Sequence, residues 1–107
     1  MALTRDFKET IKARADRDPA FRKELLKEGV ESLLSGDVET GKSILRNYIN
    51  VTVGFPQLGR AVHIEPKSIM RMFSPSGNPQ AHNLFGIIAY LQEQEEVHLL
   101  VKAAARS

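Results

Sequence analysis

The stretch FPQLGRAVHIEPKSIMRMF (Phe55–Phe73) carries the pattern that decides the fold. It predicts two short helices, about Pro56–Val62 and about Pro66–Phe73, joined by a tight corner. Its apolar residues fall at spacings that let both helices share one small core: Leu58, Val62, Ile64, Ile69 and Met72. Gly59 lies one turn into the first helix, where a bulky side chain would push the second helix away. Pro66 suits the first position of a helix, because its missing N–H has no intrahelical acceptor there.

The second of these helices places polar residues opposite its apolar ones. Lys67, Ser68 and Arg71 fall in its opening turns, at spacings that point them away from Ile69. Met70 is also predicted to face outward. A helix that presents a basic, hydroxyl-bearing face to solvent can enter the major groove of DNA.

This pattern resembles the helix-turn-helix of the Cro/Xre class of repressors. The match extends forward through the loop SPSGNP (Ser74–Pro79) and the helix after it, and backward through DPAFRKELLKEGVESLLSGD. Over about Asp18–Val101 the chain is similar to the antitoxin branch of that class, the addiction-module antidote proteins of the HigA type. The resemblance implies a mainly α fold: a lambda-repressor-like helix-turn-helix core with extra N-terminal helices and a short C-terminal β-strand.

The resemblance also implies roles for particular residues. Lys67, Ser68 and Arg71 occupy positions where family members read bases, and Gln57 matches a position that bonds the DNA backbone. Further candidates for phosphate contacts are Arg60, Lys42, Arg46, Ser76 and Asn78. Most protein–DNA hydrogen bonds go to the backbone, so most of these residues would position the protein rather than specify a sequence.

Two residues depart from the family pattern. His63 stands at the corner where the class usually has Gly with a positive φ, a conformation that His adopts more readily than most side chains but at a cost relative to Gly. Pro56 stands where the family often has Ser or Thr, so one hydroxyl that could bond a phosphate is missing.

The length predicts one domain. Within it, the resemblance implies an N-terminal helical extension (1–36), the helix-turn-helix core (37–92) and a C-terminal strand and tail (93–107). No apolar run approaches the roughly 20 residues of a membrane span, and the charged N-terminus does not have the pattern of a signal peptide. The absence of cysteine fits a reducing cytoplasm. We therefore expect a cytoplasmic protein that does not enter membranes.

The charge is concentrated in the middle of the chain. Between Lys42 and Gln92, five cations stand against the single carboxylate of Glu65, a net charge of +4 where the whole chain has +2. A basic centre with mildly acidic flanks is typical of a compact nucleic-acid footprint. A solvated surface with uneven charge remains the alternative.

Four further helices are predicted around this core. The first lies within Met1–Arg17, where Leu3, Phe7, Ile11 and Ala15 recur every four residues. The second begins at Asp18-Pro19 and ends at Gly36, the third is capped by Asp37 and runs to about Val53, and the last is capped at Asn78-Pro79 and runs to about Gln92. The predicted buried residues of the last three helices are Phe21, Leu25, Leu26, Val30, Leu33 and Leu34; Val38, Ile44, Leu45, Tyr48 and Ile49; and Leu84, Phe85, Ile87, Ile88 and Leu91.

The C-terminal tail has a different pattern. Val97, Leu99 and Val101 alternate with His98, Leu100 and Lys102, which predicts a strand. A lone strand cannot satisfy its backbone groups inside a helical domain, so it would pair with a second copy or with an edge of another protein. An unpaired apolar tail is the alternative.

Other chemistries have little support in the sequence. His63, His82 and His98 have no ligand-like spacing. There is no phosphate-binding loop of the P-loop type, no motif that joins Ser, His and Asp, and no set of exposed aromatics for RNA bases. We therefore expect no enzymatic activity, no metal and no cofactor.

The sequence thus favours a sequence-specific DNA-binding regulator of the antitoxin type. The resemblance implies a homodimer on a palindromic operator, repression of its own promoter and a toxin protein as a further partner. Two alternatives stay open: a protein-interaction module that neutralises a toxin with weak or no DNA binding, and a solitary regulator without a toxin.

Overall fold

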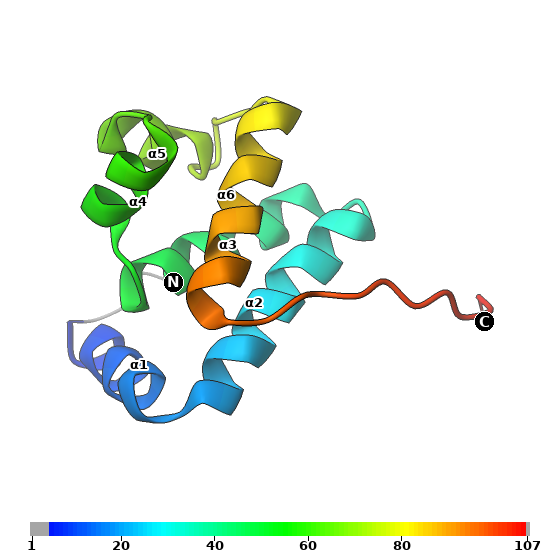
Figure 1. Ribbon diagram of the computed structural model, residues 1–107, viewed down its shortest axis with the longest axis horizontal. Helices are drawn as coiled ribbons and strands as arrows, with labels where there is room; N and C mark the ends of the chain where they lie inside the picture. The colour runs from blue at the N-terminus through cyan, green and yellow to red at the C-terminus, as the bar shows by residue number, and fades with distance from the viewer. Residues whose placement is uncertain (1–4, 107) are drawn as a thin grey trace.

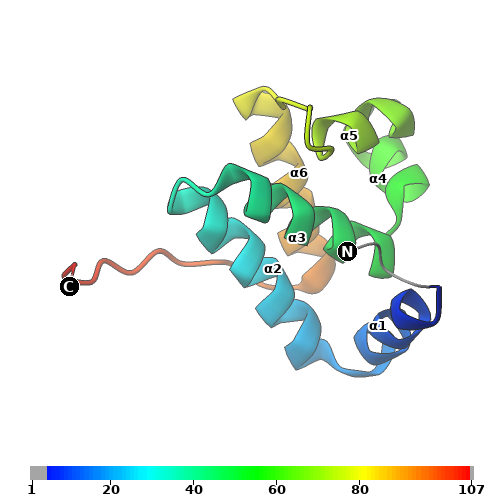
Figure 2. The same cartoon turned by 180° about the vertical axis from the view of Figure 1, so that it is seen from behind.

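The computed structural model describes the backbone of residues 5–106 and the side chains of residues 10–106. In this part of the chain the protein is an all-α domain of six helices with no strand. The helices are α1 (Arg5–Arg17), α2 (Pro19–Leu34), α3 (Val38–Val51), α4 (Phe55–Val62), α5 (Pro66–Met72) and α6 (Ala81–Glu95). Figures 1 and 2 show α2, α3 and α6 at the centre, with α4 and α5 together at one end and α1 at the other.

The predicted helix starts follow from local capping. The carboxylate of Asp18 accepts a hydrogen bond from the backbone N–H of Phe21 at 3.1 Å, and Asp37 does the same for Thr40 at 3.3 Å. These bonds satisfy N–H groups that have no partner within the helix. Gly36 has φ 92° after α2, as predicted for a left-handed residue that ends a helix. Leu3 and the side chain of Phe7, two members of the predicted α1 stripe, lie outside the described part of the chain.

Two glycines let α2 and α3 pack closely. A Cβ on Gly29 would lie 2.8 Å from Cδ2 of Leu45, and one on Gly41 would lie 2.6 Å from Cδ2 of Leu33 and 3.0 Å from the Gly29 carbonyl oxygen. Leu45 is fully buried, so it cannot move aside without disturbing the core. One apolar core then joins α2 to α6. Its buried members are Leu26, Leu45, Tyr48, Ile49, Phe55, Leu58, Ile69, Phe73, Ile87, Ile88 and Leu91.

Three predicted core residues are exposed instead. Leu34 and Val38 flank the turn between α2 and α3, where the chain reverses beyond the ends of the packed helices. Phe85 is 61% exposed, because the side of α6 that carries it faces away from the core that receives Ile87 and Ile88. The apolar spacing of a helix shows which residues can share a face, but the width of the buried stripe depends on the neighbouring helices.

The boundaries of α6 also differ from the prediction. The helix begins at Ala81 rather than after an Asn78-Pro79 cap, because Gln80 is still extended at φ −66° and ψ 146°. It continues past Gln92 to Glu95, and Glu96 then ends it in the left-handed conformation. The side chain of Glu95 is held by residues of other helices, which extends α6 by its last turn.

The predicted strand of Val97, Leu99 and Val101 is wrong. Residues 97–106 are irregular, and the exposed residues 100–106 form a tail that leaves the domain (Figure 1). No strand lies beside this tail in the described part of the chain, and α6 supplies its acceptors instead. The N–H of Val97 donates to the Gln92 carbonyl oxygen at 3.0 Å, and the N–H of Leu99 donates to Oε1 of Gln92 at 2.8 Å. Val97 and Leu99 pack against the core of their own chain, while Val101 is exposed.

Candidate nucleic-acid interface

The turn between α4 and α5 fixes how the two helices meet. His63 has φ 58° and ψ 41°, so the predicted left-handed corner is confirmed. Its N–H and that of Ile64 both donate to the carbonyl oxygen of Gly59, the latter at 3.1 Å. The last turn of α4 is thereby closed, and the chain leaves it in a set direction.

Gly59 permits the close approach of α5 to α4. A Cβ at this position would lie 2.7 Å from the carbonyl oxygen of Ile64 and 3.0 Å from Cγ of Pro66. These atoms belong to backbone and to a rigid ring, so they cannot yield as the tip of a flexible side chain can. The prediction that a larger side chain at Gly59 would displace the second helix is therefore supported by the geometry.

Helix α5 buries Ile69 and turns its cations outward. Ile69 is fully buried, and Phe73 anchors the end of the helix in the core. Lys67 and Arg71 are exposed, Ser68 is half-buried, and Met70 is 51% exposed. No acidic side chain in the described part of the chain pairs with Lys67 or Arg71. The three residues predicted to read bases therefore lie on a helix whose inner face is fixed.

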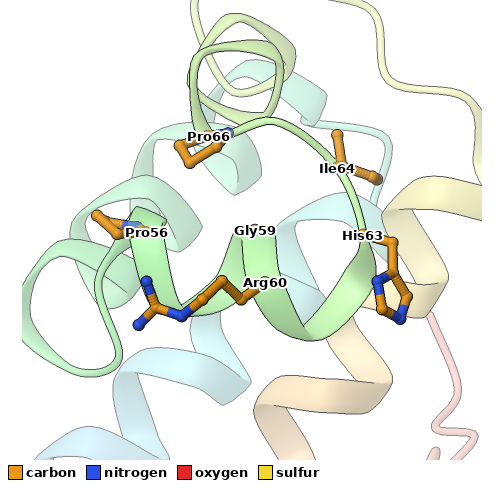
Figure 3. Close-up of a pocket in the computed structure, with 6 residues that line it drawn as sticks. All are labelled: Pro56, Gly59, Arg60, His63, Ile64 and Pro66. Atoms are coloured by element: carbon orange, nitrogen blue, oxygen red, sulfur yellow. The ribbon is translucent and has the colours of Figure 1, made fainter.

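An open hollow of about 440 Å³ lies beside this pair of helices. It is lined by Pro56, Gly59, Arg60, His63, Ile64 and Pro66. In Figure 3 the Arg60 side chain extends along the outside of α4 toward Pro56, while His63 lies at the other end of the helix. Arg60 is exposed and no described carboxylate contacts it. We call Arg60, Lys67 and Arg71 the outer cations.

Gln57 is exposed near the start of α4, and its side chain is already oriented. Its Nε2 donates to the hydroxyl oxygen of Tyr90, on α6, at 3.1 Å. Gln57 keeps a second amide N–H and a carbonyl oxygen for another partner.

The turn after α5 presents Ser76 and Asn78 as exposed residues, and Arg46 is half-buried on α3. Lys42, however, cannot be a phosphate contact. It is only 2% exposed, and its ammonium donates to the carbonyl oxygens of Ser74 and Gly77. Nothing in the sequence indicated these partners, because they lie 32 and 35 residues after Lys42.

A cluster of polar side chains that the sequence did not reveal lies where α2, α3 and α6 meet. Arg22 donates from Nε to Oε2 of Glu95 at 3.0 Å, and the hydroxyl of Tyr48 donates to Oε1 of Glu95 at 2.5 Å. Arg22 also donates from Nη1 to the carbonyl oxygen of Ala15, which ties in α1. Burial, and then the contact with Glu95, raise the pKa of Tyr48 well above its usual value. We call Arg22, Tyr48 and Glu95 the buried polar cluster.

Other kinds of site are not indicated by the described residues. Among them no three His, Asp or Glu side chains lie together as a metal site would require. None of the helices described is both long enough and apolar enough to cross a membrane. The α4–α5 pair with the turn after it is therefore the best candidate site.

Comparison with other proteins adds no assignment. No family model, no curated protein and no solved structure matches this chain. The case for a function rests on the geometry of α4, α5 and the following turn.

Proposed function

We propose that this protein binds double-stranded DNA in a sequence-specific manner and regulates transcription, with α5 in the major groove. One observation carries the proposal: Lys67 and Arg71 project into solvent from a helix whose opposite face, at Ile69, is buried against a closely packed α4. A cation on a fixed helix can meet a base edge or a phosphate at a defined place. Arg71 has the donor geometry for bidentate contact with guanine.

The dimensions of α5 support this use. An α-helix with its side chains is about 10–12 Å across, which suits a groove about 12 Å wide, and with seven residues α5 is roughly 10 Å long. So short a helix reaches only a few base pairs. We therefore propose a homodimer on a palindromic operator, with half-sites about one helical turn apart.

The resemblance to addiction-module antidotes extends the proposal to the biological role. In that role the protein represses its own promoter in the cytoplasm and is the antitoxin of a toxin–antitoxin pair. A helix-turn-helix core of the lambda-repressor type is the corresponding proposal for the fold, supported by the closed corner at His63 and the close contact at Gly59.

Selection of bound sites from random duplex DNA tests the proposal. We expect a palindromic site to be enriched, and binding to weaken steeply with rising salt as phosphate contacts are lost. The proposal fails if no sequence is enriched and if the protein also ignores duplex DNA in dilute buffer.

A second candidate is a protein-interaction module that neutralises a toxin. The observation in its favour is the tail, on which Leu100 is 83% and Val101 is 82% exposed. The test is the double substitution Leu100→Ser with Val101→Ser, which leaves the Leu99–Gln92 bond in place. Loss of binding to a toxin encoded beside this gene, with DNA binding retained, would support this candidate. Unchanged toxin binding would count against the tail as the contact.

A further inference from the structure

Lys42 is the most deeply buried charged side chain among the described residues, and its ammonium group has three close acceptor oxygens. Nζ lies 2.7 Å from the carbonyl oxygen of Gly77, 2.9 Å from that of Ser74 and 2.9 Å from Oε2 of Glu39. Two of the three N–H donors of the ammonium thus go to backbone carbonyls, and the carboxylate of Glu39 forms an ion pair with it. A buried cation without such partners would be very unfavourable, which explains why all three are present.

The two carbonyl acceptors belong to the turn that follows α5. Within this turn the N–H of Gly77 donates to the carbonyl oxygen of Ser74 at 3.0 Å. The hydroxyl of Ser74 donates to the carbonyl oxygen of Arg71 at 2.6 Å. The turn also packs back on the end of α5. A Cβ on Gly77 would overlap the carbonyl oxygen of Arg71 and would lie 2.6 Å from that of Met72.

The charge suits this location as well as the hydrogen bonds do. The carbonyl oxygens of Ser74 and Gly77 carry partial negative charge, so they form charge-assisted hydrogen bonds with the ammonium. Glu39 lies on the same helix as Lys42, one turn before it, and is largely exposed. Lys42 thus bridges α3 to the turn that follows α5 and presents Ser76 and Asn78.

We propose that Lys42 is a positioning residue of the DNA interface. It holds the end of α5 and the 74–79 turn against α3, so that Arg71, Ser76 and Asn78 meet the duplex in a fixed arrangement. It does so without touching DNA, since its side chain is only 2% exposed. The effect on DNA binding rests on the proposed function; the anchoring of the turn does not.

The first test uses the unaltered protein. In a sample labelled with ¹⁵N and ¹³C, we expect scalar coupling across hydrogen bonds from Nζ of Lys42 to the carbonyl carbons of Ser74 and Gly77. We also expect slow hydrogen exchange at the Gly77 amide. An ammonium signal of Lys42 that exchanges as fast as that of an exposed lysine would overturn the proposal.

The second test compares Lys42→Met with Lys42→Arg. Both should speed amide exchange in the turn and weaken operator binding about tenfold, the loss expected for charge-assisted bonds. Arginine should not rescue, because a planar guanidinium cannot replace a compact ammonium among three converging acceptors. Lys23→Met, which removes an exposed lysine of α2, is the control and should leave both readouts unchanged. Wild-type affinity in Lys42→Arg with a loss in Lys42→Met would show that charge alone matters, and would overturn the proposal.

A third variant tests whether Lys42 acts through this turn. Gly77→Ala should disturb the same turn through its contact with the end of α5. Its loss of operator affinity should therefore not add to that of Lys42→Met in the double variant. Additive effects would contradict the proposal. If the wild-type protein binds no duplex, the proposed function fails, but amide exchange in the free protein still decides whether Lys42 anchors the turn.

Discussion

The buried polar cluster and the outer cations use charge in opposite ways. In the cluster, every charged or polar group faces another one: Arg22 and Tyr48 share the carboxylate of Glu95. The outer cations Arg60, Lys67 and Arg71 face solvent, and no described carboxylate pairs with them. The first arrangement holds helices together, whereas the second leaves charge available to an anionic partner.

The difference separates residues that should control stability from residues that should control binding. Removing one member of a buried pair leaves an uncompensated group in the interior. Removing an exposed cation changes folding very little, but it removes an attraction to phosphates. Three predictions test this separation and one, at Gly59, tests the contact that positions α5; they are given in order of decreasing expected effect.

The largest effect is expected for Glu95→Ala. It leaves Arg22 and the hydroxyl of Tyr48 without their shared acceptor, so the free energy of unfolding should fall by about 3 kcal/mol. Urea unfolding measures the change, and the folded fraction should still bind DNA as the wild type does. Glu93→Ala, at an exposed position of α6, is the matched control and should change stability by less than about 0.5 kcal/mol. A similar, small effect in both variants would show that the cluster is not structural.

Gly59→Ala should cost about 2 kcal/mol of stability, the usual range for an overpacked site. It should also weaken DNA binding, because the added Cβ meets the Ile64 carbonyl and moves α5 away from α4. Gly86→Ala is the control. A Cβ there meets nothing within 4 Å, so the substitution should raise stability by about 0.5–1 kcal/mol through helix propensity. Equal effects of the two substitutions would contradict the close contact at Gly59.

Arg71→Ala should leave unfolding unchanged and cost about 1–3 kcal/mol of binding to the selected operator. If Arg71 grips a guanine, preference at one base pair should relax; if it grips a phosphate, the salt slope should fall by about one. Fluorescence anisotropy at several salt concentrations measures both. Arg17→Ala, an exposed arginine at the far end of the molecule, is the control. An Arg71→Ala protein with wild-type affinity and salt slope would remove Arg71 from the interface.

The smallest effect concerns pH and Tyr48. In the folded state the pKa of Tyr48 lies well above the ordinary value of 10.0. Just above pH 10, therefore, the unfolded chain releases the phenol proton and the folded protein keeps it. The free energy of unfolding should therefore fall with rising pH, by up to about 1.4 kcal/mol per pH unit from this group. Urea unfolding on both sides of pH 10 should show a shallower decline for Tyr48→Phe than for the wild type. Parallel declines would mean that Tyr48 titrates normally.

Much of the α4–α5 region could be predicted because its determinants are local. Leu58 and Ile69 are buried as their spacing indicated, Gly59 lies at a close contact, and His63 is left-handed. The start of α5 at Pro66 follows from the same stretch. Each of these features depends on residues a few positions apart.

The missed features depend on distant residues. Lys42 meets carbonyls 32 and 35 positions later, and Arg22 meets Glu95 at a separation of 73. Nothing in the local pattern marks such a pair. The strand prediction for the tail failed for a related reason. The alternation correctly placed Val97 and Leu99 on the inner side, but a strand also needs a neighbouring strand, and here the N–H of Leu99 bonds to Gln92 of α6 instead.

The most direct test of the central claim is an NMR titration of the ¹⁵N-labelled protein with the selected duplex. We predict that amide shifts change in α4, α5 and the 74–79 turn, while the amides of Arg22, Tyr48 and Glu95 stay where they are. Shifts centred on the buried polar cluster, or no shifts at any amide in dilute buffer, would contradict the account.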